Sequence, residues 1–298
     1  MRVVIAGGSG FLGRALVSAL ERDGHQPVVL TRRARQASDV VWSPGGRDRG
    51  WYSAVEGAGA VVNLSGESIA SGRWTPARKA LIERSRVEPT SALVAAIAAT
   101  RDAPHTFLSA SAIGIYGNRG DERLDESATL GHDYLALVGR LWEAAAAGTP
   151  STTRLVLLRT GVVLDRSAGA LPQLALPFRM FLGGSAGTGA QYMSWIHTDD
   201  WVEMVRWALG DVRLAGPVNL TAPAPASNLE FARTLGRVLG RPAFVRAPAF
   251  ALRLALGEMA DGLVLGGQRV VPAKAQALGF TFRYAALETA LRAIYDAR

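Results

Sequence analysis

The start of the chain joins a strand pattern to a helix pattern through closely spaced glycines. Residues 2–6 (RVVIA) are apolar and mostly β-branched, and Gly7, Gly10 and Gly13 follow with the spacing G-x-x-G-x-x-G. Leucines at positions 12, 16 and 20 then recur at helical spacing. A strand that ends in a glycine-rich turn and leads into a helix is the context in which such glycines bind a nucleotide. Glycines alone are common in turns, so a plain βα turn is the alternative.

Each of these glycines has its own physical reason. Gly7 takes the sharp turn without a Cβ clash. Gly10 lets a pyrophosphate approach the backbone, and Gly13 lets the helix pack close to the strand. The free N–H groups and the positive dipole end of the helix then face the phosphates. The pattern therefore predicts a phosphate-binding loop between residues 7 and 13.

Composition excludes several classes of protein. The chain has 298 residues, 49% of them hydrophobic and 19% charged, which is typical of a soluble globular protein. There is no cysteine, and the four histidines are scattered, so we expect no disulfide and no metal site. The formal charge of +8 is not gathered into a basic run or an aromatic-interleaved stripe, so we expect no nucleic-acid partner.

The short length of the uncharged apolar runs bears on where the protein is located. No apolar run reaches about 18 uncharged residues, so we expect no membrane span and no membrane partner. The first strand begins at Arg2, so we expect no signal peptide before it. A cytoplasmic location follows by default, with the protein a monomer or a homodimer.

The second predicted strand, Gln26–Leu30, ends at Thr31, Arg32 and Arg33. An acidic residue here takes the ribose hydroxyls in NAD-binding units. The sequence instead has two arginines, whose guanidinium groups suit a 2′-phosphate. The pattern favours NADP(H) over NAD(H), and a solvated arginine pair is the alternative.

Strand and helix patterns alternate through the first half of the chain. The strand pattern 58–64 runs into Asn63-Leu64-Ser65-Gly66-Glu67, and the strand that starts at His105 leads to Ser109, Ser111 and Tyr116. A helix is predicted over 76–100, with Thr75 as its N-cap, and we expect most of Arg78, Arg84 and Arg86 on it to face solvent. Further patterns predict strands at 40–43, 153–158, 193–197 and 217–220, and helices at 131–147, 228–239 and, with aspartate caps, after 198.

This alternation predicts an α/β fold: a Rossmann-type doubly wound parallel sheet with a smaller C-terminal lobe. We assign residues 1–160 and about 196–222 to the dinucleotide-binding domain. Residues 161–195 and 223–298 form the smaller lobe, where Gly- and Pro-rich loops and short helices are expected.

Five stretches resemble the extended short-chain dehydrogenase/reductase family: GGSGFLG, NLSGE, SASAIGIYG, LRTGVVL and SWIHTDD, in that order. The segment from Ser65 to Arg86, the segment FLGGSAGTG and the C-terminal PAFALRLALGEMADGLVLGGQRVVPAKAQALGF are similar to a subfamily called "epimerase family protein", related to nucleotide-sugar epimerases. The resemblance covers nearly the whole chain and implies a Rossmann domain that binds NADP(H).

The resemblance also implies which residues hold the cofactor. Thr31 and Arg32 should hold the 2′-phosphoribose, and Leu64 and Ser65 should line the adenosine and ribose side. Arg86 should reach the cofactor, and Val163 should touch the nicotinamide half. The pyrophosphate should be held by Gly7, Ser9, Gly10, Phe11 and Leu12.

The sequence departs from this family at the proton-transfer pair. Relatives with known chemistry use Tyr-x-x-x-Lys on the helix after the SxSxxxxYG strand, because the lysine lowers the pKa of the tyrosine. No tyrosine here is followed by lysine or arginine four residues later. If Glu143 is aligned with the acidic residue that often follows the family's lysine, Leu135 falls at the tyrosine site and Gly139 at the lysine site.

Ser111 and Tyr116 are the remaining candidates for catalysis, with Ser111 polarising a carbonyl and Tyr116 acting as a substitute acid. For each, a packed structural residue is the alternative, and the same holds for Trp74, Trp195 and His197 as pocket residues. Two functions stay open. One is an NADP-dependent oxidoreductase or epimerase acting on a small polar carbonyl, hydroxyl or sugar-nucleotide-like compound. The other is a non-catalytic NADPH-binding sensor or regulator.

Overall fold

A seven-stranded, fully parallel sheet forms the centre of the computed structural model, which describes residues 1–296. The strand order is β12-β7-β5-β4-β1-β2-β3, so the direction of winding reverses between β1 and β4. Ligands of such sheets bind at the carboxyl ends of the strands beside this reversal. The strands are β1 (Arg2–Ala6), β2 (Gln26–Thr31), β3 (Val40–Val41), β4 (Ala60–Asn63), β5 (Thr106–Ala112), β7 (Arg154–Thr160) and β12 (Gly216–Leu220).

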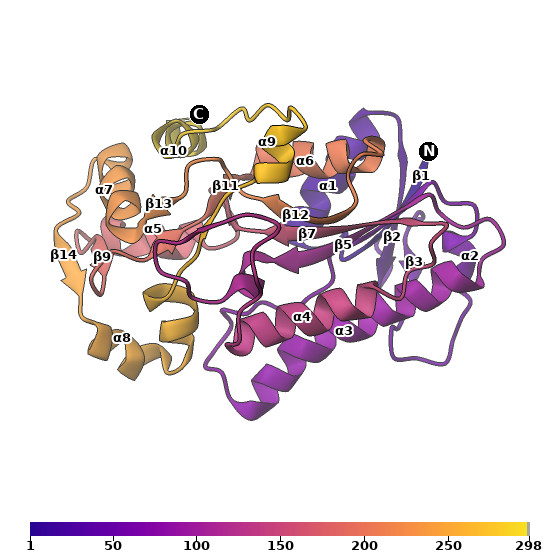
Figure 1. Ribbon diagram of the computed structural model, residues 1–298, viewed down its shortest axis with the longest axis horizontal. Helices are drawn as coiled ribbons and strands as arrows, with labels where there is room; N and C mark the ends of the chain where they lie inside the picture. The colour runs from indigo at the N-terminus through magenta and orange to yellow at the C-terminus, as the bar shows by residue number, and fades with distance from the viewer. Residues whose placement is uncertain (297–298) are drawn as a thin grey trace.

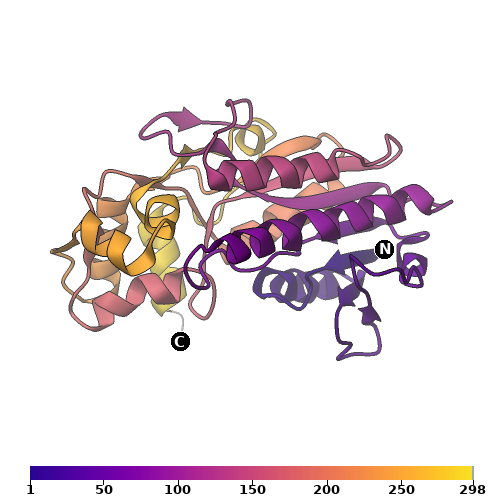
Figure 2. The ribbon, with the colours of Figure 1, turned by 90° about the horizontal axis from the view of Figure 1, so that it is seen from below.

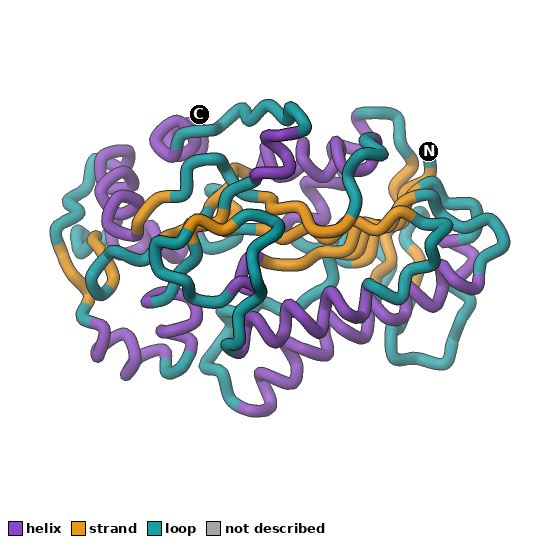
Figure 3. The backbone as a smooth tube through the Cα atoms, in the orientation of Figure 1, coloured by secondary structure: helices purple, strands orange, loops and turns teal. Residues whose placement is uncertain are grey.

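Helices cover both faces of this sheet (Figures 1 and 3). On one face, α1 (Phe11–Arg22) packs beside α6 (Thr198–Gly210), and on the other α2 (Tyr52–Val55) and α4 (Tyr134–Ala146) accompany the long α3 (Pro76–Ala99). Alternate residues of β1 enter the two apolar layers, because successive side chains of a strand point to opposite faces. The doubly wound α/β fold predicted from the alternation is therefore confirmed.

Local capping explains where two of these helices begin. Thr75 accepts a hydrogen bond from the Arg78 N–H and Pro76 follows it, as predicted for α3. The prediction of aspartate caps on α6 was wrong, because Asp199 and Asp200 lie in its first turn. The cap is His197, whose Nδ1 accepts from the Asp199 N–H at 3.0 Å.

A second group of elements gathers at the end of the molecule away from the N-terminus (Figure 2). Short strands pair there, β9 with β14 and β10 with β13, and β8 (Val162–Leu164) pairs in parallel with β11 (Trp195–His197). The strand predicted at 193–197 is divided between β10 and β11. The other bounds are α5 (Leu171–Arg179), β9 (Gly184–Ala186), β10 (Tyr192–Met193), β13 (Ala226–Ser227), α7 (Asn228–Leu239), β14 (Val245–Ala247), α8 (Ala249–Leu256) and α10 (Leu287–Asp296).

The C-terminal part of the chain also returns to the central sheet. Strand β15 (Arg269–Val270) pairs with β6 (Arg123–Leu124), and α9 (Ala273–Ala277) packs against β12. The buried Asp200 carboxylate accepts hydrogen bonds from the backbone N–H groups of residues 283 and 284. Part of the segment assigned to the lobe thus lies along the sheet. In the described part of the chain no helix is long and apolar enough to cross a membrane.

Candidate functional site

The turn between β1 and α1 is shaped to admit a phosphate group. Gly7 has φ +81°, and a Cβ there would lie 2.7 Å from the Leu64 carbonyl carbon. A Cβ on Gly13 would lie 2.2 Å from the Gly7 carbonyl oxygen. The helix can therefore approach the strand this closely only because residue 13 is a glycine. No side chain caps the start of α1 at Gly10, which leaves its first N–H groups for an anion.

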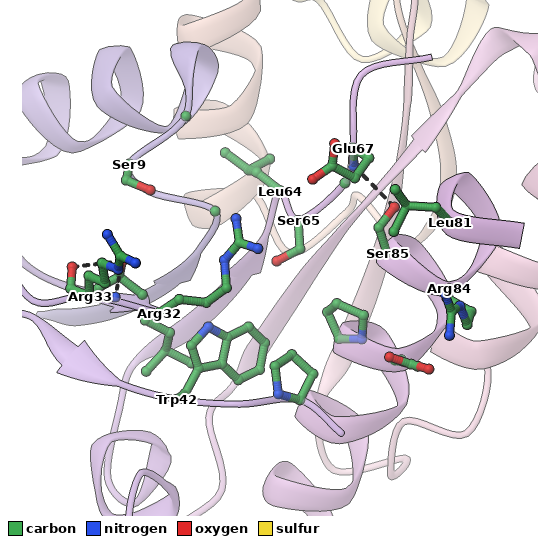
Figure 4. Close-up of a pocket in the computed structure, with 18 of the residues that line it drawn as sticks. Ser9, Arg32, Arg33, Trp42, Leu64, Ser65, Glu67, Leu81, Arg84 and Ser85 are labelled. Atoms are coloured by element: carbon green, nitrogen blue, oxygen red, sulfur yellow. Dashed lines mark hydrogen bonds between the residues drawn. The ribbon is translucent and has the colours of Figure 1, made fainter. Parts of the chain in front are cut away.

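A cationic turn follows β2. The Thr31 hydroxyl accepts from the Arg33 N–H at 3.3 Å and lies 3.1 Å from the Arg33 carbonyl oxygen, to which it donates, so it fixes this turn. Figure 4 shows Arg32 extending over Trp42 with its guanidinium directed toward Ser65. No carboxylate lies within ion-pair distance of Arg32 or Arg33 in the described residues. The turn therefore has free positive charge for an anionic ligand.

These groups border one cavity of about 1030 Å³ at the carboxyl ends of β1, β2 and β4 (Figure 4). The opposite wall comes from β4 and α3, where Leu64, Ser65 and Ser85 face the arginines. Asn63 orients this wall, since its Oδ1 accepts from the Ser65 N–H and its Nδ2 donates to the Thr90 hydroxyl on α3. Sequence reasoning did not single out three further lining residues, Arg35, Trp42 and Arg84.

Arg86 contradicts the expectation that most of the α3 arginines face solvent. It donates to the carbonyls of Ile82 (2.9 Å) and Glu67 (3.0 Å), and its guanidinium lies 5.1 Å from the Trp142 ring. Burial lowers the pKa of this guanidinium to about 10, so it stays charged at neutral pH. Arg78 is also mostly covered, and only Arg84 is exposed.

A second cavity of about 240 Å³, here called the chamber, opens at the carboxyl ends of β5 and β7. Helix α4 forms one wall, and β10 with residues 262–268 of the C-terminal part forms another. Of the residues that line it, Arg86 and Tyr192 are the two with titratable side chains. Its apolar lining consists of Ile69, Ala112, Ile113, Leu135, Val138, Trp142, Val162, Leu174, Met193, Leu263 and Val264.

Comparison with known proteins places this arrangement in a family. The model described as "NAD dependent epimerase/dehydratase family" matches residues 3–136, and a domain of unknown function, DUF1731, matches residues 247–294. The chain is 41% identical over 99% of its length to the chloroplastic SDR39U1 homolog of Arabidopsis thaliana, an epimerase family protein, and covers 86% of it. The chain belongs to this epimerase family. Epimerase family protein YfhF of Bacillus subtilis is 38% identical, with 98% and 97% of the two chains covered.

Solved structures agree with this family membership. The crystal structure of human epimerase family protein SDR39U1 (isoform 2) with NADPH superimposes with a TM-score of 0.93 at 32% identity and 100% coverage of both chains. A nucleoside-diphosphate sugar epimerase from Corynebacterium glutamicum gives a TM-score of 0.82 at 34% identity, covering 99% of this chain and 58% of that one. The family and the Rossmann-type fold that the motifs indicated are confirmed.

The chamber has no counterpart of the Tyr-x-x-x-Lys pair that related enzymes use for proton transfer. If Glu143 is aligned with the family's acidic residue, Leu135 and Gly139 take the tyrosine and lysine positions, and both line the chamber together with Ala112 of β5. A Cβ on Gly139 would lie 2.9 Å from the Ile115 Cβ, so α4 packs closer than a lysine would allow. With this alignment the chamber has neither side chain of the pair, and it has no space for a lysine at Gly139.

Ser111 and Tyr116, predicted to act in catalysis, lie away from the chamber in a buried polar network. The Ser111 hydroxyl donates to Glu143 at 2.7 Å, and Glu143 forms a two-point ion pair with Arg159 at 2.8 and 2.9 Å. The Tyr116 hydroxyl donates to Asn219 at 2.7 Å and accepts from Arg159 at 2.9 Å. Tyr116 has no exposed surface. Ala112, one residue after Ser111, is the β5 residue that faces the chamber.

Burial also sets the protonation of Tyr116. It raises the pKa of the hydroxyl, although the Arg159 guanidinium opposes this shift. Tyr116 therefore stays protonated at neutral pH, with both its donor and its acceptor capacity engaged. Neither Ser111 nor Tyr116 lines the chamber, and both hydroxyls are engaged inside the network, so a catalytic role for either residue stays a prediction.

Some of the residues predicted to bind the cofactor or to line a pocket lie in a cavity wall, and the others lie in the core. Gly7, Ser9, Gly10, Thr31, Arg32, Leu64 and Ser65 line the larger cavity, and Arg86 lines the chamber. Phe11, Leu12 and Val163 instead belong to the apolar layer under α1 and α6, and Val162 is the neighbour that faces the chamber. Trp74, Trp195 and His197 line neither of these two cavities.

Proposed function

We propose that this chain binds NADP(H), with the adenosine half in the larger cavity. The observation that carries the proposal is the pair Arg32 and Arg33 at the end of β2, in a cavity whose phosphate turn has no room for a Cβ at Gly7 or Gly13. Two unpaired guanidinium groups suit a 2′-phosphate, whereas ribose hydroxyls are recognised by a carboxylate. The crystal structure of the human relative with NADPH supports the same ligand.

Titration of NADPH and NADH tests this proposal. Arg32→Ala should weaken NADPH binding by about 1.5–3 kcal/mol, roughly 10- to 150-fold, because a charge-assisted hydrogen bond is lost. The affinity for NADH should hardly change. Arg101→Ala, an exposed arginine outside both cavities, is the matched control. Equal affinities of the wild type for NADPH and NADH would refute the proposal.

We propose further that the chamber takes a small carbonyl compound and supports its reduction. Bound NADPH supplies a hydride. Removal of a hydroxyl proton, which the oxidative half of an epimerisation needs, requires a base, and the chamber lining holds no carboxylate, histidine or lysine. Reduction needs only a proton donor. Tyr192 is the lining hydroxyl that fits this role, since those of Ser194 and Thr160 already donate to backbone carbonyls.

A panel of carbonyl compounds with NADPH tests this second step. Tyr192→Phe should lower any measured turnover by at least about 10-fold and leave NADPH affinity unchanged. Tyr134→Phe is the matched control, because its hydroxyl donates to the Lys79 carbonyl outside the chamber lining. Unchanged turnover in Tyr192→Phe would refute its role as donor.

The alternative is a non-catalytic NADPH-binding sensor, and the apolar residues Leu135 and Gly139 at the pair's positions favour it. Tight NADPH binding with no turnover across the panel would support this alternative.

In both cases we propose a cytoplasmic protein, monomer or homodimer, with a small-molecule ligand. A fusion to a fluorescent protein would test the location, since the Arabidopsis relative is chloroplastic.

A further inference from the structure

Three consecutive large apolar side chains protrude where α5 ends. Met180, Phe181 and Leu182 are 59%, 56% and 57% exposed, and Leu176, one turn earlier on α5, is 55% exposed. Apolar residues scattered singly on a surface need no explanation, but a contiguous group marks an interaction site. The neighbouring Phe178 is buried in the lobe, so the chain places one aromatic ring inside and the next outside.

The backbone at Phe181 is in an unfavourable conformation. Its φ is +62°, and among the described residues no other non-glycine residue has a positive φ. The Leu182 N–H donates to the Pro177 carbonyl at 2.8 Å, which is the helix-ending motif that glycine normally occupies at this position. A bulky residue in this conformation costs free energy, and such outliers concentrate at functional positions.

A second exposed ring joins this group across a pair of strands. Leu182 precedes β9, Phe244 precedes β14, and these two strands pair in parallel. The Val245 N–H donates to the Gly183 carbonyl at 3.1 Å, so Phe244, 79% exposed, lies opposite Gly183, the residue that follows Leu182. The Arg241 guanidinium lies 4.7 Å from the Phe181 ring. We call Met180, Phe181, Leu182 and Phe244 the apolar tip.

The two segments that carry the apolar tip contain arginines and no acidic residues. Residues 231–257 contain five arginines and no acidic residue, and residues 166–198 also lack aspartate and glutamate. An open groove of about 480 Å³ beside the tip is lined by Arg233, Arg237 and Arg241 together with Phe244. Arg237 also pairs with Glu288 at 3.1 Å, whereas no carboxylate lies within ion-pair distance of Arg233 or Arg241 among the described residues.

We propose that the apolar tip inserts into the interface of a membrane that contains anionic lipids. Protruding apolar side chains with a rim of arginines match the two parts of such a surface: acyl chains and phosphate headgroups. The arginines in the groove provide donors for the phosphates. A second copy of this chain is the less favourable occupant, because a two-fold contact through the tip would bring the arginines of both copies together.

Vesicle flotation with purified protein tests this proposal. Wild type should float with phosphatidylcholine vesicles that contain phosphatidylglycerol and not with pure phosphatidylcholine. Phe181→Gly should lower the partition coefficient at least about 10-fold, since one buried aromatic ring is lost. Glycine is the preferred residue in this conformation, so the variant should unfold at a higher temperature than wild type. Val212→Ser is the control, because Val212 is 79% exposed between α6 and β12, away from the tip.

A charge variant separates the outcomes. Arg233→Gln with Arg241→Gln should weaken binding to the anionic vesicles, and added salt should weaken it further in the wild type. Equal flotation with neutral and anionic vesicles, or no flotation with either, would overturn the proposal. So would a wild-type dimer, seen by analytical ultracentrifugation, that Phe181→Gly converts to a monomer, because the tip would then be a contact between copies.

Discussion

Removing the Tyr116 hydroxyl should destabilise the protein rather than impair its site. Tyr116→Phe keeps the ring in the cluster of Ile113, Ile115 and Leu124 and deletes one oxygen. It leaves the Asn219 Oδ1 without its donor and one Arg159 nitrogen with only a long bond of 3.4 Å to the Glu126 carbonyl. Buried polar groups that lose a partner are costly, so the effect should be large for a single atom.

The geometry of the network gives the size of this effect. The bond to Arg159 is charge-assisted and is worth about 1.5–3 kcal/mol, and the bond to Asn219 adds about 1 kcal/mol. Arg159 keeps its two-point ion pair with Glu143, which limits the loss. We therefore expect Tyr116→Phe to lower the free energy of unfolding by about 2–4 kcal/mol. Ser111→Ala should cost less, because Glu143 retains Arg159.

Urea denaturation followed by circular dichroism at neutral pH measures this change. Tyr52→Phe is the control, because the Tyr52 hydroxyl bonds to the exposed Arg49 and its loss should cost less than about 0.5 kcal/mol. NADPH affinity of the folded Tyr116→Phe variant should equal that of wild type. An unchanged free energy of unfolding together with a lower NADPH-dependent turnover would refute this reasoning and return Tyr116 to the catalytic site.

Two further predictions concern other parts of the fold. Burial lowers the pKa of His197, so the unfolded state binds the proton first as the pH falls below about 6.5, and stability should then fall by up to about 1.4 kcal/mol per pH unit. His197→Asn keeps a capping side chain and removes the titrating imidazole, so it should flatten the pH dependence of the free energy of unfolding. Urea unfolding from neutral to mildly acidic pH measures this dependence, and an unaltered slope would contradict the prediction. Gly13→Ala should weaken NADPH binding and lower the melting temperature more than Gly10→Ala, because their Cβ atoms would lie 2.2 and 3.2 Å from the Gly7 oxygen; the reverse order would argue against the tight β1–α1 contact.

Features encoded in a short stretch could be predicted from the sequence. The turn at Gly7 and the cap at Thr75 depend on residues a few positions apart, and both are observed. Arg32 and Arg33 follow a strand end that the sequence pattern predicts, and both border the larger cavity. The two-residue strands β6 and β15 gave no such signal, since each exists only through pairing with a distant partner.

The chamber depends on packing between distant segments, so its lining could not be predicted in the same way. Alternation along β5 leaves open whether Ser111 or Ala112 faces a cavity until α4 is placed beside the strand. Arg86 is half-buried because Trp142, from another helix, lies against it. Tyr192 and residues 262–268 were missed for the same reason. Their sequence gives no sign of the site, and the close contacts of Gly262, Gly266 and Gly267 with other segments are seen only in the folded chain.

The return of the C-terminal part to the sheet bears on how the protein is made. During synthesis β6 leaves the ribosome long before β15, and the Asp200 carboxylate is complete long before residues 283 and 284 can bind it. Until then this side of the nucleotide domain has an unpaired strand edge and a carboxylate without its partners. The nascent chain therefore stays open to mispairing until residues 269–284 appear, and it is in this interval that a chaperone would find exposed edges to bind.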